Sequence, residues 1–471
     1  MPRFLALLGV ALSFAWASPD TTAHLLIQDS SQLRWAAVRV SLAESLQVND
    51  FGTMHRQSST WAGLLAYGEL SPRWSWRSSV HVFTDIANFY YPVNDYQPYH
   101  GIPYNLQGSI PDSAKHRTWD YITGYTEYRP FDSTMFCAGL DYLHMGPSYR
   151  NPVAFRGDQS IFRPWQDTAR EIQKPAPIAF VGFDLGLKWI SYSQYSGKLE
   201  ERNTLDKYIH THRLTFHLPG NSEFGLSETE LYGTSVKPYT TQKGEVDSVG
   251  RTMEWLYAMP FIPYYFASHY LGDQDNGAMG FDGIYRGLKH WEFYGELFID
   301  DSKSPLSLFD TTWWGNKWAF SAGSHWFMER GKWKAEWRGE YTRIEPWVYT
   351  HYEGLSHQYT NFNQILGSDL GPNSQEIYTH IQVGYDKAQL KLSLSSVAKD
   401  TAKGGSISDL HLPTDPTNKV FLNPASTFRY KELGCDMSYA PWSFVWLRLA
   451  GYRYWGHFDG YRVESALGLT W

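Results

Sequence analysis

The chain has 471 residues, a formal net charge of −7 and 17% aromatic residues. It contains no basic tract of the kind that nucleic-acid binding needs, which excludes nucleic acid as a partner. Beyond its first residues, no stretch approaches the roughly 18 apolar residues of a transmembrane helix. A membrane protein built from helices is therefore excluded as well.

Residues 1–17 are predicted to be a signal peptide. Arg3 precedes an apolar run that ends at Trp16, and small residues stand on either side of that tryptophan. The run is too short to anchor the chain in a bilayer. We expect cleavage after Ala17, so that residues 18–471 form the mature protein as a single domain.

Strand-like segments recur from roughly residue 33 to the end of the chain. The clearest runs, 213–218, 291–299, 333–342 and 388–396, alternate apolar with polar residues, and no helical period fits them. Short turns alternate with long links, as in bacterial outer-membrane barrels. The pattern predicts an all-β membrane protein, an antiparallel transmembrane β-barrel of the bacterial outer membrane.

The strand count follows from the two ends. We place the first strand near Gln32–Leu42 and the last at 461–471, which gives 18 strands. An even count puts both ends in the periplasm. The alternative count is 16, because Leu33–Leu46 also fits a helix.

The long links are expected on the outer side, where they fill the lumen together with short helices. Links of this length are seldom idle in a compact protein. Within 233–277, Met253–Ala258 is expected to be a short helix, and Phe261–Leu271 to fold into the lumen or form an outer lid. The expected long links are 85–115, 145–176, 200–206, 233–277, 300–314, 345–373 and 399–426.

The last strand alternates apolar and polar residues and ends in an aromatic residue, Trp471. One face of such a strand suits lipid. This end is the expected signal for the barrel-insertion machinery, and outer-membrane lipids and lipopolysaccharide are the expected neighbours of the wall. Cys137 and Cys435 fall within expected strands, so we interpret them as small buried thiols rather than a disulfide.

No specific catalytic constellation is present. Ser-His neighbours such as Ser268-His269 are expected by chance in a chain with 17 histidines, and metal motifs such as His-Glu-x-x-His are absent. Paired carboxylates are also the chemistry of glycosidases, but Glu296, Asp300 and Asp301 are interpreted as supports inside the lumen. We expect no enzyme activity, no metal and no cofactor.

Aromatic and polar residues gather where a strand meets a loop, in the stretch 341–352 and at Trp313-Trp314. Aromatic faces stack on sugar rings, so the pattern favours polysaccharide recognition. The same rings also fit the outer aromatic girdle of a membrane protein. Both interpretations stay open for the loop residues, whereas Trp337 in mid-strand is assigned to the girdle or the wall.

An ordered series of segments resembles the Wzi family of capsule-assembly proteins. The series covers most of the mature chain, with Ser148 standing where the family's first segment has glycine. The segments are Met145-Gly146-Pro147-Ser148-Tyr149-Arg150, Glu230 to Gly233, Met259-Pro260-Phe261, Asn276-Gly277, Tyr294 to Asp301, Glu340 to Arg343 with Pro346, Tyr349 and His351, Tyr359 to Asn361, and Leu366 to Asn373.

The resemblance implies an 18-stranded barrel that acts as a surface lectin, binding and organising capsular or other extracellular polysaccharide without bond chemistry. A diffusion porin is the alternative function. We expect a monomer, because no flat apolar patch between strands is evident. The residues expected to contact the saccharide or shape its pocket are Glu340, Arg343, Trp347, Tyr349, His351 and Asn373.

Overall fold

The structure is a computed structural model that describes residues 36–470. Gaps fall at 51–53, 88–115, 164–174, 200–205, 241–245, 273–274 and 303–311, and at residues 353, 355 and 363. The expected signal peptide and the terminal Trp471 lie outside the described residues. Within these ranges, no helix has the length and apolar character that crossing a membrane would require.

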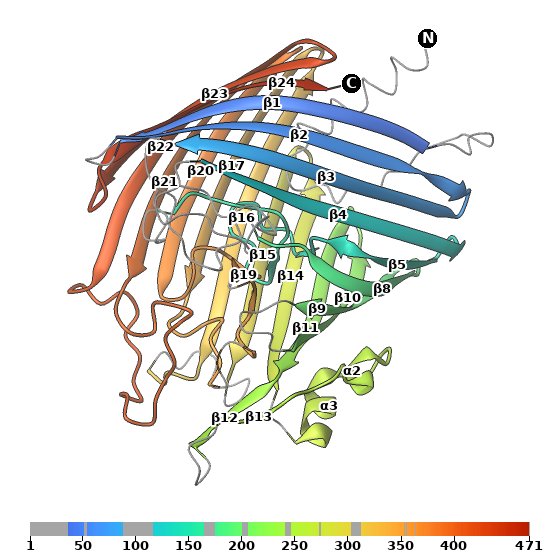
Figure 1. Ribbon diagram of the computed structural model, residues 1–471, viewed down its shortest axis with the longest axis vertical. Coiled ribbons are helices and arrows are strands. Elements are labelled where there is room, and N and C mark those ends of the chain that lie inside the picture. Colours follow the sequence, from blue (N-terminus) through green and yellow to red (C-terminus); the bar gives the residue numbers. More distant parts are fainter. Residues whose placement is uncertain are drawn as a thin grey trace.

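Eighteen antiparallel strands form one closed sheet, as the alternating pattern predicted (Figure 1). The first strand pairs with the last, with Leu42 opposite Leu469, and this pairing closes the barrel. The strands are β1 (Ala36–Asp50), β2 (Met54–Ser71), β3 (Trp74–Ala87), β4 (His116–Phe131), β5 (Thr134–Asp141), β8 (Ile178–Gly186), β9 (Ile190–Leu199), β10 (Lys207–Leu218), β11 (Ser222–Gly233), β14 (Asn276–Leu288), β15 (Trp291–Asp301), β16 (Lys317–Arg330), β17 (Trp333–Ile344), β20 (Ser374–Tyr385), β21 (Ala388–Asp400), β22 (Thr427–Trp442), β23 (Val445–Gly456) and β24 (Gly460–Thr470).

The first strand differs from its expected bounds. It is described from Ala36 to Asp50 and so extends past the expected end at Leu42, while residues 32–35 lie outside the described residues. It is a strand rather than a helix. Its whole length pairs with β2, from Ala36 opposite Gly68 to Asp50 opposite Met54. Hydrogen bonding along both edges, to β2 and to β24, holds these residues in a strand. The alternation of this segment is too weak to predict the bounds of the strand.

The two faces of the wall have different chemistry. Residues directly opposite each other in a ladder share a face, so Leu392, Ile381, Trp337 and Cys435 all point outward. Leu392 is 48% exposed, as are many outward Leu, Ile and Val side chains on the other strands. An apolar outer face on a closed barrel is what a lipid-spanning wall requires. Cys137 lies buried on the inward face, so the two cysteines face opposite sides of the wall.

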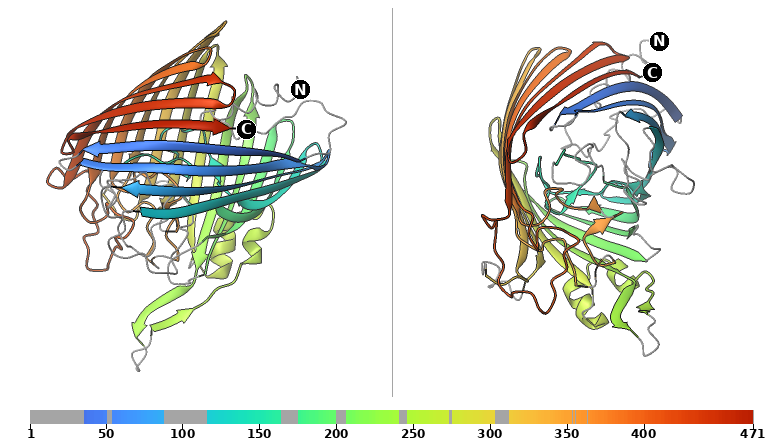
Figure 2. Two further views of the ribbon diagram at one scale, coloured as in Figure 1. Left: turned by 45° about the horizontal axis from the view of Figure 1, so that its top comes forward. Right: turned by 60° about the vertical axis from the view of Figure 1, so that its left-hand side comes forward.

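Two loop segments enter the lumen (Figure 2). Segment 142–163 carries the small pair β6 (His144–Met145) and β7 (Phe155–Arg156), and segment 345–373 carries β18 (Thr360–Asn361) and β19 (Gln364–Ile365). Phe155 packs on Tyr359 between the two segments, and both rings are buried. The expectation that long links fill the lumen is correct for these two.

The helices lie elsewhere. Helices α2 (Trp255–Ala258) and α3 (Tyr264–Leu271) lie outside the wall near β11 (Figure 1). The hairpin β12 (Ser235–Thr240) and β13 (Val246–Val249) projects from the end of β11, beyond the barrel. The expectation that short helices fill the lumen is therefore wrong. The helices contact outward-facing residues of β9, β10 and β11.

Candidate functional site

Two lumenal carboxylates hold the segment 145–153 by its backbone. Glu296 accepts hydrogen bonds from the N–H groups of Ser148 (2.6 Å) and Val153 (2.9 Å). Glu340 accepts from Tyr149 (2.8 Å) and from Asn151 (2.8 Å). Buried N–H groups need partners, and charge-assisted bonds are the strong ones. Glu296 and Glu340, whose side chains point into the lumen, therefore fix the path of segment 145–153.

A buried ion-pair cluster holds the far end of the same loop. Arg163 contacts Glu376 (2.9 Å) and Asp369 (3.1 Å), and Arg150 contacts Glu376 from another side (3.1 Å). Burial alone lowers the pKa of Arg163, but the carboxylates of Glu376 and Asp369 reverse this and raise the pKa above its ordinary value. The cluster ties loop 145–163 to the wall at β20.

The second loop is held in the same way. Asp300, on the inward face of β15, accepts the N–H of Tyr349 (2.9 Å), and the hydroxyl of Tyr349 donates to the carbonyl of Val153 (2.7 Å). Trp347 and Tyr349 both have positive φ angles, 69° and 71°. Such angles are strained for bulky side chains, and strain of this kind gathers at functional sites. The surrounding contacts force segment 345–349 into one shape.

Three outer links meet in what we call the outer aromatic cluster, formed by Trp313, Trp314, Trp347 and His411. The ring of Trp314 stacks on His411, with centroids 3.7 Å apart, and Trp347 lies 5.2 Å from His411. Trp347 is almost completely buried, whereas Trp314 and His411 are half-buried. The backbone N–H of Trp347 donates to Gly404 (3.0 Å), which joins the links 345–373 and 401–426.

The predicted contact residues separate into two groups. Trp347 belongs to the outer aromatic cluster. Glu340, Tyr349, His351 and Asn373 are buried beneath the mouth, where they hold the loops. Asn373, for example, accepts the N–H of Leu422 at 2.9 Å.

Two predicted residues lie away from both groups. Arg343 follows the outward face at the end of β17, where it covers the ring of Phe421 at 3.8 Å and pairs with Glu345. The alternation that puts Glu340 inward puts Arg343 outward. Asp301 was expected to be a lumen support. It lies half-exposed at the outer rim beside Lys317 (3.6 Å), because the ladder shifts register between Ile299 and Asp301.

Two other residues of the site, Glu376 and His411, were not identified from the sequence. Glu376 stands on the inward face of β20 and the alternation identifies that face, but nothing in the sequence showed that two arginines bind it. His411 lies in a link that carries no motif. Among the described residues, no group of three or more His, Cys, Asp or Glu is placed to hold a metal ion.

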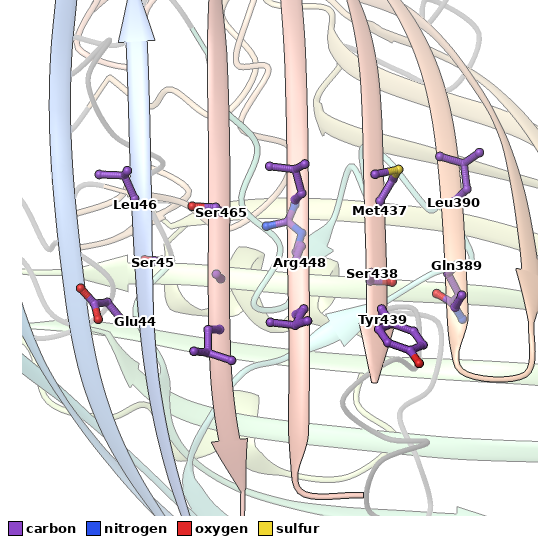
Figure 3. A pocket seen from close by; sticks show the side chains of 15 residues that line it. Glu44, Ser45, Leu46, Gln389, Leu390, Met437, Ser438, Tyr439, Arg448 and Ser465 are labelled. Carbon is purple, nitrogen blue, oxygen red and sulfur yellow. The ribbon is translucent and has the colours of Figure 1, made fainter. Parts of the chain in front are cut away.

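A hollow of about 750 Å³ lies in the wall at the seam between β1 and β24 (Figure 3). Leu46, Leu390 and Met437 line it from the outward face of neighbouring strands. The lining is mainly apolar and faces lipid. The hollow is therefore part of the membrane-facing surface, and it does not belong to the site at the mouth.

No protein-family model matches the chain, and neither does any curated protein. Among solved structures, the chain is similar to Wzi of Escherichia coli, described as an outer membrane protein involved in group 1 capsule assembly and a carbohydrate-binding β-barrel. The TM-score is 0.55 at 15% identity, over 92% of this chain and 84% of Wzi. OpdK of Pseudomonas aeruginosa, solved with vanillate, matches with a TM-score of 0.48 at 9% identity, over 93% of this chain and 98% of its own. The similarity to Wzi agrees with the fold derived above, a closed outer-membrane barrel.

We predict that Glu340→Gln loosens segment 145–153. The substitution keeps the size of the side chain but removes the charge that the N–H groups of Tyr149, Arg150 and Asn151 face. A lost charge-assisted network of this kind costs on the order of 2–3 kcal/mol. Limited proteolysis of the folded barrel should show faster cleavage within 145–163. Glu329→Gln, at an exposed pair with Lys334, is the control and should cleave like the wild type.

We also predict that acid weakens the packing of segment 345–373. Burial lowers the pKa of His357 from 6.5 to about 4; Asp275 opposes this shift, and Arg251 and Lys207 add to it. Between pH 6.5 and 4 the unfolded chain binds a proton that the folded chain does not. The free energy of unfolding therefore decreases as the pH is lowered from 6.5 to 4, by about 3 kcal/mol over the whole window.

Urea titration of the protein in lipid vesicles measures this slope. His357→Gln should flatten it, and His457→Gln, at an exposed histidine, should leave it unchanged. An equal slope in the wild type and His357→Gln would show that His357 is not the titrating group.

Proposed function

We propose that the protein binds extracellular polysaccharide at the outer surface of the outer membrane, without cleaving it. The observation that carries the proposal is the outer aromatic cluster, built by three separate links, of which 345–373 is held from beneath by Asp300. Aromatic rings held rigidly lose little conformational entropy on binding. Flat rings with polar neighbours suit the faces of sugar rings.

The loops in the lumen support binding over conduction. An open diffusion porin needs a clear lumen, whereas segments 142–163 and 345–373 occupy it with buried, ion-paired residues. Glu340, Tyr349, His351 and Asn373 would then shape the site from below. Trp347, which is almost completely buried, would support the rings of Trp314 and His411, and these would contact the sugar. Carbohydrate binding by Wzi, as its description states, is the same class of function.

Export by a signal peptide at 1–17, insertion through Trp471, contact with lipopolysaccharide and a monomeric state remain predictions. They accompany the proposal and are not part of its evidence. Capsular material is the polysaccharide that the family resemblance favours, and the chemistry of the cluster fits any glycan with exposed sugar faces.

Binding of the host's own surface polysaccharide tests the proposal. Detergent-purified protein should bind extracted polysaccharide saturably, and Trp314→Ala should weaken binding by about thirtyfold, since truncating an aromatic anchor costs on the order of 2 kcal/mol. Trp314→Phe keeps a ring and should recover part of the affinity. Trp442→Ala, at an exposed tryptophan on the short-turn side, is the matched control.

Two outcomes would contradict the proposal. One is the absence of saturable binding by the folded wild-type protein. The other is equal affinity in the wild type, Trp314→Ala and Trp442→Ala, which would show that binding does not use the cluster.

A further inference from the structure

A strap of residues 255–271, which includes α2 and α3, lies against the outside of the barrel wall (Figure 1). Between Glu254 and Gly272 the sequence contains no Asp, Glu, Lys or Arg, and it is rich in aromatic residues. Outer loops that stand in water normally carry charges. The composition of this strap therefore needs a physical explanation.

The strap covers a polar patch on the outward face. Val181 on β8 is 57% exposed and faces lipid, and Ser196 stands directly opposite it on β9. Across the next ladders, Ser196 is opposite His210, and His210 is opposite Glu230. These polar residues share the lipid-facing side of the wall, where a bare charge or hydroxyl is costly.

The strap supplies hydrogen bonds to the neighbouring polar residues on the same outward face. Its backbone, with few side-chain contributions, pairs with side chains of β9 and β11. The bonds join Gln194 Nε2 to the carbonyl of Tyr257 (3.0 Å), the N–H of Phe261 to the hydroxyl of Tyr192 (3.1 Å), and the N–H of Tyr264 to Glu228 (2.6 Å). The ring of Tyr264 also packs on His212, with centroids 4.2 Å apart.

The opposite side of the strap is apolar and bare. Tyr270 is 84% exposed and Phe266 is 67% exposed. An amphipathic segment in water turns its apolar face toward the protein and its polar face outward. This strap is apolar on both sides, because Tyr257, Tyr264 and Ala267 are buried against the wall. An apolar outer side is expected where the outer solvent is lipid. The large exposed side chains are Trp255, Met259, Phe261, Tyr265, Phe266 and Tyr270.

The strap also lies beside the wall rather than above it. Tyr192, which accepts the N–H of Phe261, is the third residue of β9 counted from the short-turn side. Phe224 and Met279, exposed on the outward faces of β11 and β14, continue the apolar surface next to the covered patch. The bare side of the strap is thus continuous with the lipid-facing surface of the barrel.

We propose that residues 255–271 lie within the lipid bilayer of the outer membrane, with their bare aromatic side against lipid acyl chains. The strap replaces lipid over the polar patch of β9–β11 and anchors the 234–275 link to the membrane. This inference does not depend on polysaccharide binding. A second copy of the chain, or water, would be the competing occupant of this surface.

Spin labels attached to the strap show directly whether its exposed side lies in lipid or in water. In a Cys137→Ala, Cys435→Ala background, nitroxides are placed by Phe266→Cys and, separately, Tyr270→Cys. Each protein is folded into phosphatidylethanolamine and phosphatidylglycerol vesicles, and folding is checked by its heat-dependent mobility on gels. Leu392→Cys on the lipid-facing wall and Leu412→Cys in an exposed link are the reference positions.

We expect labels at 266 and 270 to collide with dissolved oxygen more than with a water-soluble nickel complex, as at 392 and opposite to 412. A ratio like that at 412 would place the strap in water and overturn the proposal. Spin–spin broadening that grows as the protein-to-lipid ratio rises would show that a second copy covers it, and would also overturn it. Labelling at two positions keeps the test decisive if one variant fails to fold.

Discussion

The rest of the molecule depends on how carboxylates buried in the barrel lumen are neutralised. A buried charge without partners costs far more than a domain can spare. Glu296, Glu340 and Glu376 meet this constraint by binding loop N–H groups and two arginines. Because the loops that enter the lumen exclude water from these carboxylates, the loops must also supply their partners. The loops in turn keep their path because the carboxylates hold them.

The mouth follows from the same constraint. Asp300 fixes Tyr349 from below, and two residues earlier Trp347 emerges into the outer aromatic cluster. Rings that would otherwise move on a long link are therefore presented in one arrangement. Rigid presentation by a buried support is how binding surfaces gain affinity without new contacts. The shape of the outer surface therefore depends on contacts inside the lumen.

The local sequence pattern predicts the strands of the wall but not the loop residues that their side chains bind. The alternation at 333–342 and 388–396 is enough to predict strands and their two faces, because period two is a property of neighbouring residues. The pairing of Glu340 with Tyr149 is not predictable in this way, since 191 residues separate them. The position of Phe261–Leu271, expected in the lumen or as an outer lid, was not predictable either, because a protein interior and a lipid bilayer select the same side chains.

The most direct test of this account is the conductance of the wild-type protein in a planar lipid bilayer, with folding confirmed beforehand. If lumenal carboxylates hold the two loops in place, the folded barrel should show no large, steady channels, since segments 142–163 and 345–373 occupy the lumen in the described part of the chain. Large and steady channels from fully folded protein would contradict the account, because they would mean that the loops do not occupy the lumen.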